Sequence, residues 1–209
     1  MRFQYCLILW LLSALAQAQQ PFLNERTAFE LIDTALQQEP LLWMPFPLPY
    51  EIDRASQDKD ARLLEALFDH DLVQREKVTR MVEVTENGVA RRKVRVGWRY
   101  EYPASREIAP EHRTVTEGQT QQGFYYGRRQ LKAIMELTSG YRLGEYYYAE
   151  AYIQWFVADL QDWVDDLAFD RARTLRRSKE SFDKPFEKRV YLMHDGDSWG
   201  FWNGTPGQL

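Results

Sequence analysis

The sequence predicts an α+β protein in which a helical, winged-helix-like N-terminal half is followed by a small antiparallel β-sheet half with one short helix. Apolar residues recur at three- and four-residue spacing over residues 25–36 and 60–69, as in amphipathic helices. They alternate with polar residues over several later segments, as in strands. The 209 residues are 44% hydrophobic and 28% charged, which is the composition of a folded chain with its own core.

The first residues have the pattern of an export signal. Arg2 precedes an apolar run over residues 6–15, and Ala16-Gln17-Ala18 has the spacing of a cleavage site. Because the run is shorter than the roughly 20 apolar residues that cross a bilayer, we expect residues 1–18 to be a cleaved signal peptide. The predicted location is the periplasm, with no transmembrane segment left after cleavage; an uncleaved anchor is the alternative. Cleavage would also remove Cys6, the only cysteine, which argues against thiol catalysis and disulfides.

Residues 19–103 are the predicted helical and winged part. Asn24 can cap a helix over residues 25–36, and a second helix is expected over residues 60–69. The proline-rich residues 41–50 between them are expected to lie extended against the domain, as neither a helix nor a central strand.

A β-hairpin is expected to close this part. Its predicted strands are residues 77–84 and 94–102, joined through a turn at Glu86-Asn87-Gly88. Val94, Val96 and Trp98 alternate with arginine, lysine and glycine, so we expect them to face the core. A helix followed by a two-stranded hairpin is typical of the back half of a winged-helix module.

The second half is predicted to be a small antiparallel sheet. Residues 104–122 are polar, as in a linker or a long surface loop, and residues 123–209 form the sheet part. The expected elements are strands over residues 124–137 and 146–157, a short helix over 160–169 with Leu160, Trp163, Val164 and Leu167 on one face, and a terminal hairpin over 188–194 and 198–202.

One stretch of this half resembles a known group of proteins. The segment Gly123-Phe124-Tyr125-Tyr126-Gly127, followed by Ile134, a tyrosine-rich strand and Asp162-Trp163, is similar to small uncharacterised Gram-negative envelope proteins that are periplasmic or lipoprotein-like. The resemblance covers roughly residues 45–202. It implies an envelope location and brings no active-site residues with it.

Candidate catalytic groups are few. The three histidines, His70, His112 and His194, lie among charged or turn residues and share no metal-ligand spacing, so no catalytic histidine, metal or other cofactor is expected. Glu150 stands out because it interrupts a run of tyrosine and alanine. Paired with an aspartate from residues 159–166, it could serve a cell-wall hydrolase, which is the alternative function.

Two sets of side chains are candidates for binding. Tyr146, Tyr148 and Tyr152 share one face of a strand and could form an exposed surface that stacks on a glycan or peptide. The basic candidates for contact with an anionic envelope component are Arg95, Arg99, Arg128 and Arg129.

The combined expectation is an exported, non-enzymatic periplasmic protein that binds a protein or an anionic envelope component through an aromatic and basic sheet surface. A nucleic-acid partner is not expected, because of the export signal and the net charge of -4. A cytoplasmic winged-helix regulator would follow only if the first residues were not a signal.

Overall fold

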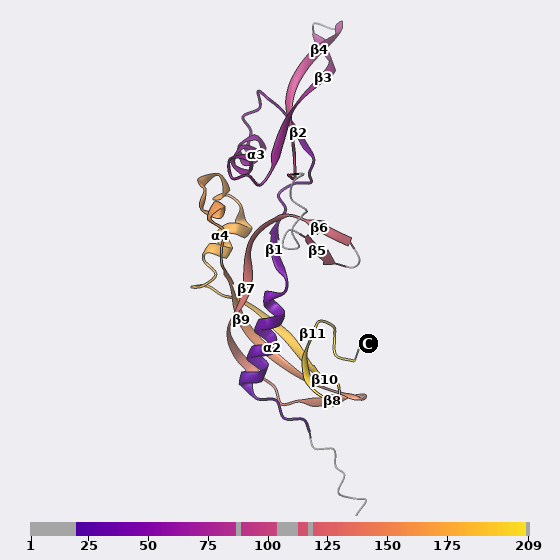
Figure 1. Ribbon diagram of the computed structural model, residues 1–209, viewed down its shortest axis with the longest axis vertical. Coiled ribbons are helices and arrows are strands. Elements are labelled where there is room, and N and C mark those ends of the chain that lie inside the picture. Colours follow the sequence, from indigo (N-terminus) through magenta and orange to yellow (C-terminus); the bar gives the residue numbers. More distant parts are fainter. Residues whose placement is uncertain (1–19, 87–88, 104–112, 117–118, 208–209) are drawn as a thin grey trace, which may run out of the picture. The chain divides into compact units, whose positions relative to one another are not determined.

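The computed structural model describes residues 20–86, 89–103, 113–116 and 119–207 (Figure 1). This part of the chain is mostly β, with eleven strands, three α-helices and two short 3₁₀ helices. The predicted α+β fold with a helical, winged-helix-like N-terminal half is therefore wrong. Both helices expected there are present, as α2 (Glu25–Gln37) and α3 (Lys59–Asp69), but they form no helical module. No helix in the described ranges is long and apolar enough to cross a membrane.

The chain forms two compact units. One comprises the described residues of Met1–Ala35, Leu131–Gln154 and Phe186–Leu209, and the other comprises those of Leu36–Gln130 and Trp155–Pro185. Most strands belong to a six-stranded sheet in the order β1-β7-β9-β10-β11, with β8 paired to β9. Its strands are β1 (Pro40–Trp43), β7 (Phe124–Leu137), β8 (Tyr141–Leu143), β9 (Tyr146–Ala158), β10 (Phe186–His194) and β11 (Trp199–Trp202). The two long central strands and the terminal hairpin were all predicted.

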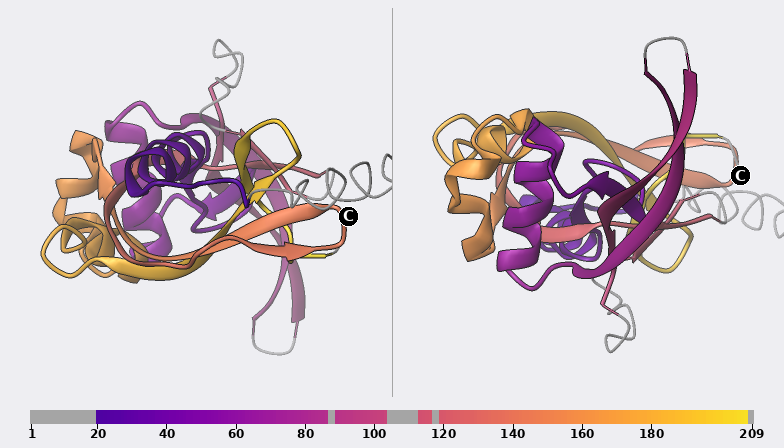
Figure 2. Two further views of the ribbon diagram at one scale, coloured as in Figure 1. Left: turned by 90° about the horizontal axis from the view of Figure 1, so that it is seen from below. Right: turned by 90° about the horizontal axis from the view of Figure 1, so that it is seen from above.

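Helix α2 belongs with this sheet, which is why the N-terminal half is not a separate helical module. Asn24 caps the helix by accepting a hydrogen bond from the Thr27 backbone N–H at 2.7 Å. Ile32 is fully buried, and Asp33 accepts the backbone N–H of Leu131 in β7 at 2.9 Å. Figure 2 shows α2 lying against the curled sheet. Ala149, Ala151 and Ile153 of β9 are fully buried as well.

A three-stranded sheet in the second unit has the order β2-β4-β3. Its strands are β2 (Tyr50–Asp53), β3 (Gln74–Glu86) and β4 (Val89–Glu101). The Asp58 side chain caps α3 through the Ala61 backbone N–H at 2.8 Å, and Leu64 and Leu67 are fully buried. β1 and β2 each lie at the edge of their sheets, as expected for chain rich in proline.

The predicted helix over 160–169 is replaced by two 3₁₀ helices, η2 (Asp162–Asp165) and η3 (Leu167–Phe169), before α4 (Arg173–Lys179). Asp166 is extended, with φ -64° and ψ 135°, and its side chain caps η3 through the Ala168 backbone N–H. This break turns the chain, so Trp163 is buried as expected but Leu167 is 82% exposed.

The predicted linker over residues 104–122 lies partly outside the described residues. Its described part forms β5 (Arg113–Thr116) and β6 (Gln119–Gln122), which pair with each other as a two-stranded sheet.

Candidate functional site

The most distinctive feature of the second unit is a long two-stranded ribbon made by β3 and β4. The two strands pair over their whole length, from Gln74 with Glu101 to Glu86 with Val89. β2 pairs only with residues 97–100 of β4, so residues 79–86 and 89–96 continue as two strands without a third (Figure 1). We call these residues the arm. Its predicted turn falls on Asn87 and Gly88, which lie outside the described residues.

Basic residues are concentrated on one face of the arm. Residues directly opposite in an antiparallel pair share a face, so the register places Arg91, Lys93, Arg95 and Arg80 together. Among the arm residues whose side chains the structure describes, no acidic residue lies on that face. Val82 and Val84 lie between the basic positions. The face thus combines four cations with small apolar side chains.

The basic residues nearest the body of the unit are neutralised. Arg80 forms an ion pair with Glu51, and Arg95 lies 3.7 Å from the Asp53 carboxylate. Farther out, Arg91 and Arg92 make no ion pair with any side chain that the structure describes. The outer half of the arm therefore has an exposed arginine on each face, Arg91 on the basic face and Arg92 on the opposite face.

The opposite face of the arm carries an exposed apolar pair next to Glu83 and Arg92, which lie directly opposite each other. Met81 and Val94 are directly opposite each other and are 66% and 62% exposed. The expectation that Val94 faces the core is wrong, because Val94 lies on the arm beyond the residues of β4 that pair with β2, and its side chain is exposed. Trp98 is only half-buried, and Tyr100, one alternation nearer the body, is 2% exposed.

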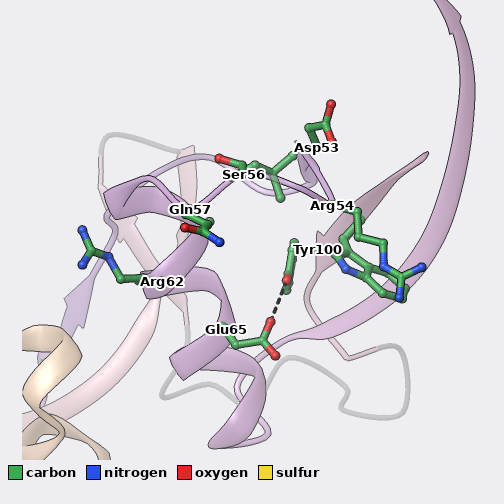
Figure 3. Close-up of a pocket in the computed structure, with 10 residues that line it drawn as sticks. Asp53, Arg54, Ser56, Gln57, Arg62, Glu65 and Tyr100 are labelled. Carbon is green, nitrogen blue, oxygen red and sulfur yellow. Dashed lines mark hydrogen bonds between the residues drawn. The ribbon is translucent and has the colours of Figure 1, made fainter. Parts of the chain in front are cut away.

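A pocket of about 420 Å³ lies at the root of the arm (Figure 3). The Tyr100 hydroxyl donates to Glu65 at 3.3 Å, and Arg75 donates to the same carboxylate at 2.5 Å. Burial raises the pKa of Tyr100, which keeps its hydroxyl protonated near neutral pH. The Arg75 guanidinium also lies 4.8 Å from the centre of the Trp98 ring. These contacts fix the start of the arm against α3.

The polar groups of this pocket do not converge on one point. In Figure 3, Arg54 and Arg62 lie on opposite sides, and Arg62 points away from Tyr100 and Glu65. Arg54 instead lies 5.7 Å from the Trp98 ring. We therefore assign the pocket a structural role, in holding the arm. Sequence analysis did not find it, because its residues come from a loop, a helix and a strand that only the fold brings together.

The three tyrosines predicted to form a binding surface differ in their burial and in their contacts. Tyr148 is fully buried, with its ring 6.2 Å from Tyr141 and 6.4 Å from Trp202, so it lies on no exposed surface. Tyr152 is half-buried, and its hydroxyl donates to Glu187. Tyr146 is half-buried and lies opposite Leu143 of β8.

The predicted arginines outside the arm are each paired with a carboxylate. Arg128 lies 2.6 Å from Asp159, and Arg129 pairs with Glu39 and lies 5.5 Å from the Trp155 ring. Arg99, below the arm on β4, is 3.7 Å from Glu101 and 3.9 Å from Glu76. Of the predicted basic residues, only Arg95 belongs to the arm, and Arg91 and Arg92 next to it carry the unpaired charge.

The candidate catalytic groups form ordinary structural contacts. Glu150 accepts a hydrogen bond from Arg189, and His70 at the end of α3 lies 3.1 Å from Asp166. The His194 ring nitrogen Nδ1 accepts the Gly196 backbone N–H at 3.1 Å, whereas His112 lies outside the described residues. Within the described ranges, no three His, Cys, Asp or Glu side chains gather in a way that could hold a metal ion.

No protein-family model, curated protein or solved structure matches this chain. The resemblance to Gram-negative envelope proteins therefore stays a prediction.

Proposed function

We propose that this chain is an exported, non-enzymatic protein that binds the anionic phospholipid headgroups of an envelope membrane through the arm. The observation that supports this function is the exposed basic face of a two-stranded ribbon in a chain whose net charge is -4. The acidic chain as a whole is repelled by an anionic surface, so attraction requires a local patch of the opposite sign.

The chemistry of the face suits phosphate headgroups. Arg91 and Lys93 supply donors for phosphate oxygens, and Val82 and Val84 between them can contact the boundary of the acyl region. A two-stranded ribbon with no covered face is marginal in water, so a surface that covers one face of the arm also stabilises it. The export predicted from the residues before 19 would bring the protein to a compartment where such headgroups are present.

Vesicle co-sedimentation tests this proposal. We expect the protein to bind phosphatidylglycerol vesicles and not phosphatidylcholine vesicles, with binding that falls as salt is raised. Replacing Arg91 and Lys93 by Gln should remove about 2 kcal/mol of binding, because a basic residue near an anionic membrane contributes about 1 kcal/mol. This corresponds to a roughly 30-fold weaker affinity.

The matched control is R173Q/R176Q, which removes the same charge from two exposed residues of α4. Its vesicle affinity should stay within about threefold of the parent. Equal losses in both variants would show general electrostatic attraction and contradict a role for the arm. Binding to duplex DNA or an acidic protein without binding to phosphatidylglycerol would refute the assignment to lipid.

A further inference from the structure

A second hollow in the same unit, separate from the arm, has the character of an amphiphile site. It is a groove of about 520 Å³ between α3 and the segment that begins at η3. Its apolar lining includes Trp43, Phe46, Leu63 and Leu167. The Trp43 ring is held 5.5 Å from the Phe169 ring and 5.9 Å from the Trp163 ring, so this wall is fixed by packing. Its volume is in the range of small-molecule sites.

Leu167 marks the open side of the groove. It is 82% exposed, although its neighbour Phe169 in the same 3₁₀ helix is buried. A large aliphatic side chain this exposed beside an apolar wall gains free energy when an apolar ligand covers it.

Three basic side chains, Lys59, Arg62 and Arg171, line the groove together with these apolar residues. None of them forms an ion pair with a carboxylate in the described part of the chain. The acidic residue in the lining, Asp60, already accepts a hydrogen bond from the Tyr50 hydroxyl at 3.1 Å. The groove therefore has a surplus of two positive charges beside an apolar wall.

The position of two of these cations is unfavourable for the fold itself. Lys59 and Arg62 lie in the first turn of α3, where the helix dipole disfavours positive charge. The nearby Asp58 carboxylate is engaged by the Ala61 backbone N–H and by the Ser56 hydroxyl at 2.8 Å. A bound anion would offset the unfavourable placement, and Figure 3 shows Arg62 turned away from the root of the arm.

We propose that this groove binds a single-chain lipid with a phosphomonoester headgroup, a class represented by lysophosphatidic acid. The acyl chain would lie along Phe46, Leu63 and Leu167, and the phosphate would lie among the three cations. A phosphomonoester carries a charge of about -1.5 to -2 at neutral pH, which matches the surplus of the lining. Arg62 and Arg171 can each donate two hydrogen bonds to one phosphate.

Calorimetric titration with lysophosphatidic acid below its critical micelle concentration tests the site. We expect saturable binding with one ligand per chain. Lysophosphatidylcholine shares the acyl chain but is zwitterionic, and glycerol 3-phosphate shares the headgroup but has no acyl chain. Each should bind at least about tenfold more weakly than lysophosphatidic acid, because the first lacks the phosphomonoester that meets the cations and the second lacks the chain that meets the apolar wall.

Two variants test the basic part and the apolar part of the groove separately. R62Q/R171Q should weaken lysophosphatidic acid binding at least about tenfold without lowering the melting temperature, because these side chains have no ion-pair partner to lose and Arg62 is unfavourable in the first turn of α3. L167S should weaken binding by removing the contact with the acyl chain, and its stability should stay close to that of the parent because Leu167 is exposed. R173Q/R176Q is again the charge-matched control and should bind as the parent does.

The proposal is overturned if lysophosphatidic acid shows no saturable binding, if glycerol 3-phosphate binds equally well, or if R62Q/R171Q binds as tightly as the parent. Capture of an apolar peptide in preference to the lipid would also overturn it. The site is independent of the proposed function, because R91Q/K93Q should lose vesicle binding but keep lysophosphatidic acid binding. Each proposal can therefore fail without the other.

Discussion

Tyr148→Phe should stabilise the protein, although tyrosine to phenylalanine normally removes a useful hydrogen bond. Tyr148 is fully buried, and its hydroxyl has no hydrogen-bond partner among the described residues. A buried hydroxyl without a partner costs about 1–3 kcal/mol, because it gives up its hydrogen bonds to water on folding. The substitution removes this oxygen and keeps the ring in contact with Tyr141 and Trp202.

The gain should be at least about 1 kcal/mol, or roughly 2–4 °C in melting temperature for a chain of this length. Urea unfolding followed by tryptophan fluorescence would measure it, with the slope m unchanged. Tyr126→Phe is the matched control, since Tyr126 is also buried but forms a hydrogen bond with Ser178. We expect that variant to lose about 1 kcal/mol. If Tyr148→Phe destabilises the protein as Tyr126→Phe does, the hydroxyl has a partner and the reasoning is refuted.

Two other predictions concern the root of the arm and the response to acid. Trp98→Ala should lower the free energy of unfolding in urea by about 1–2 kcal/mol, less than for a fully buried tryptophan, since Trp98 is half-buried beneath Arg75. Val94→Ala, at an exposed position, should change the free energy of unfolding by less than about 0.5 kcal/mol. Equal losses in the two variants would show that the arm is covered on this face. The Ala168 backbone N–H and His70 lower the pKa of Asp166, so its contribution to stability is present above the unfolded pKa near 4 and is lost as pH falls through the lower folded value. Asp166→Asn should make unfolding less dependent on pH below about 4, and an unchanged pH profile would contradict this assignment.

Short-range patterns in the sequence predicted the longer helices and strands. The alternation over residues 94–102 predicted a strand, and the cap Asn24 marked the start of α2. What the patterns could not predict was the partner of each element. Nothing near α2 in the sequence indicates that Asp33 accepts a hydrogen bond from Leu131, about a hundred residues away. This contact joins α2 to β7, so α2 belongs to the large sheet and not to a helical N-terminal half.

Burial was the second quantity that local patterns could not supply. The alternation of side chains along a strand shows which residues share a face of the sheet, and Val94 and Trp98 do share one. It does not tell where the covering elements end, so Val94 is exposed while Tyr100 is buried. The same limit applies to Tyr148, which lies on the strand face expected to be wet but is covered by Trp202 from the last strand.

The net charge of the chain is likewise a poor guide to its surface, because electrostatic attraction in salt is local. The eight residues of β4 in the arm extend about 26 Å at roughly 3.3 Å per residue, beyond the last residue that pairs with β2. The Debye length at physiological ionic strength is about 8 Å, so charges near the end of the arm are largely screened from carboxylates at its root. A surface that meets Arg91 and Lys93 therefore responds to their charge and not to the chain's net charge of -4. The basic face can attract an anionic membrane although the protein as a whole is acidic.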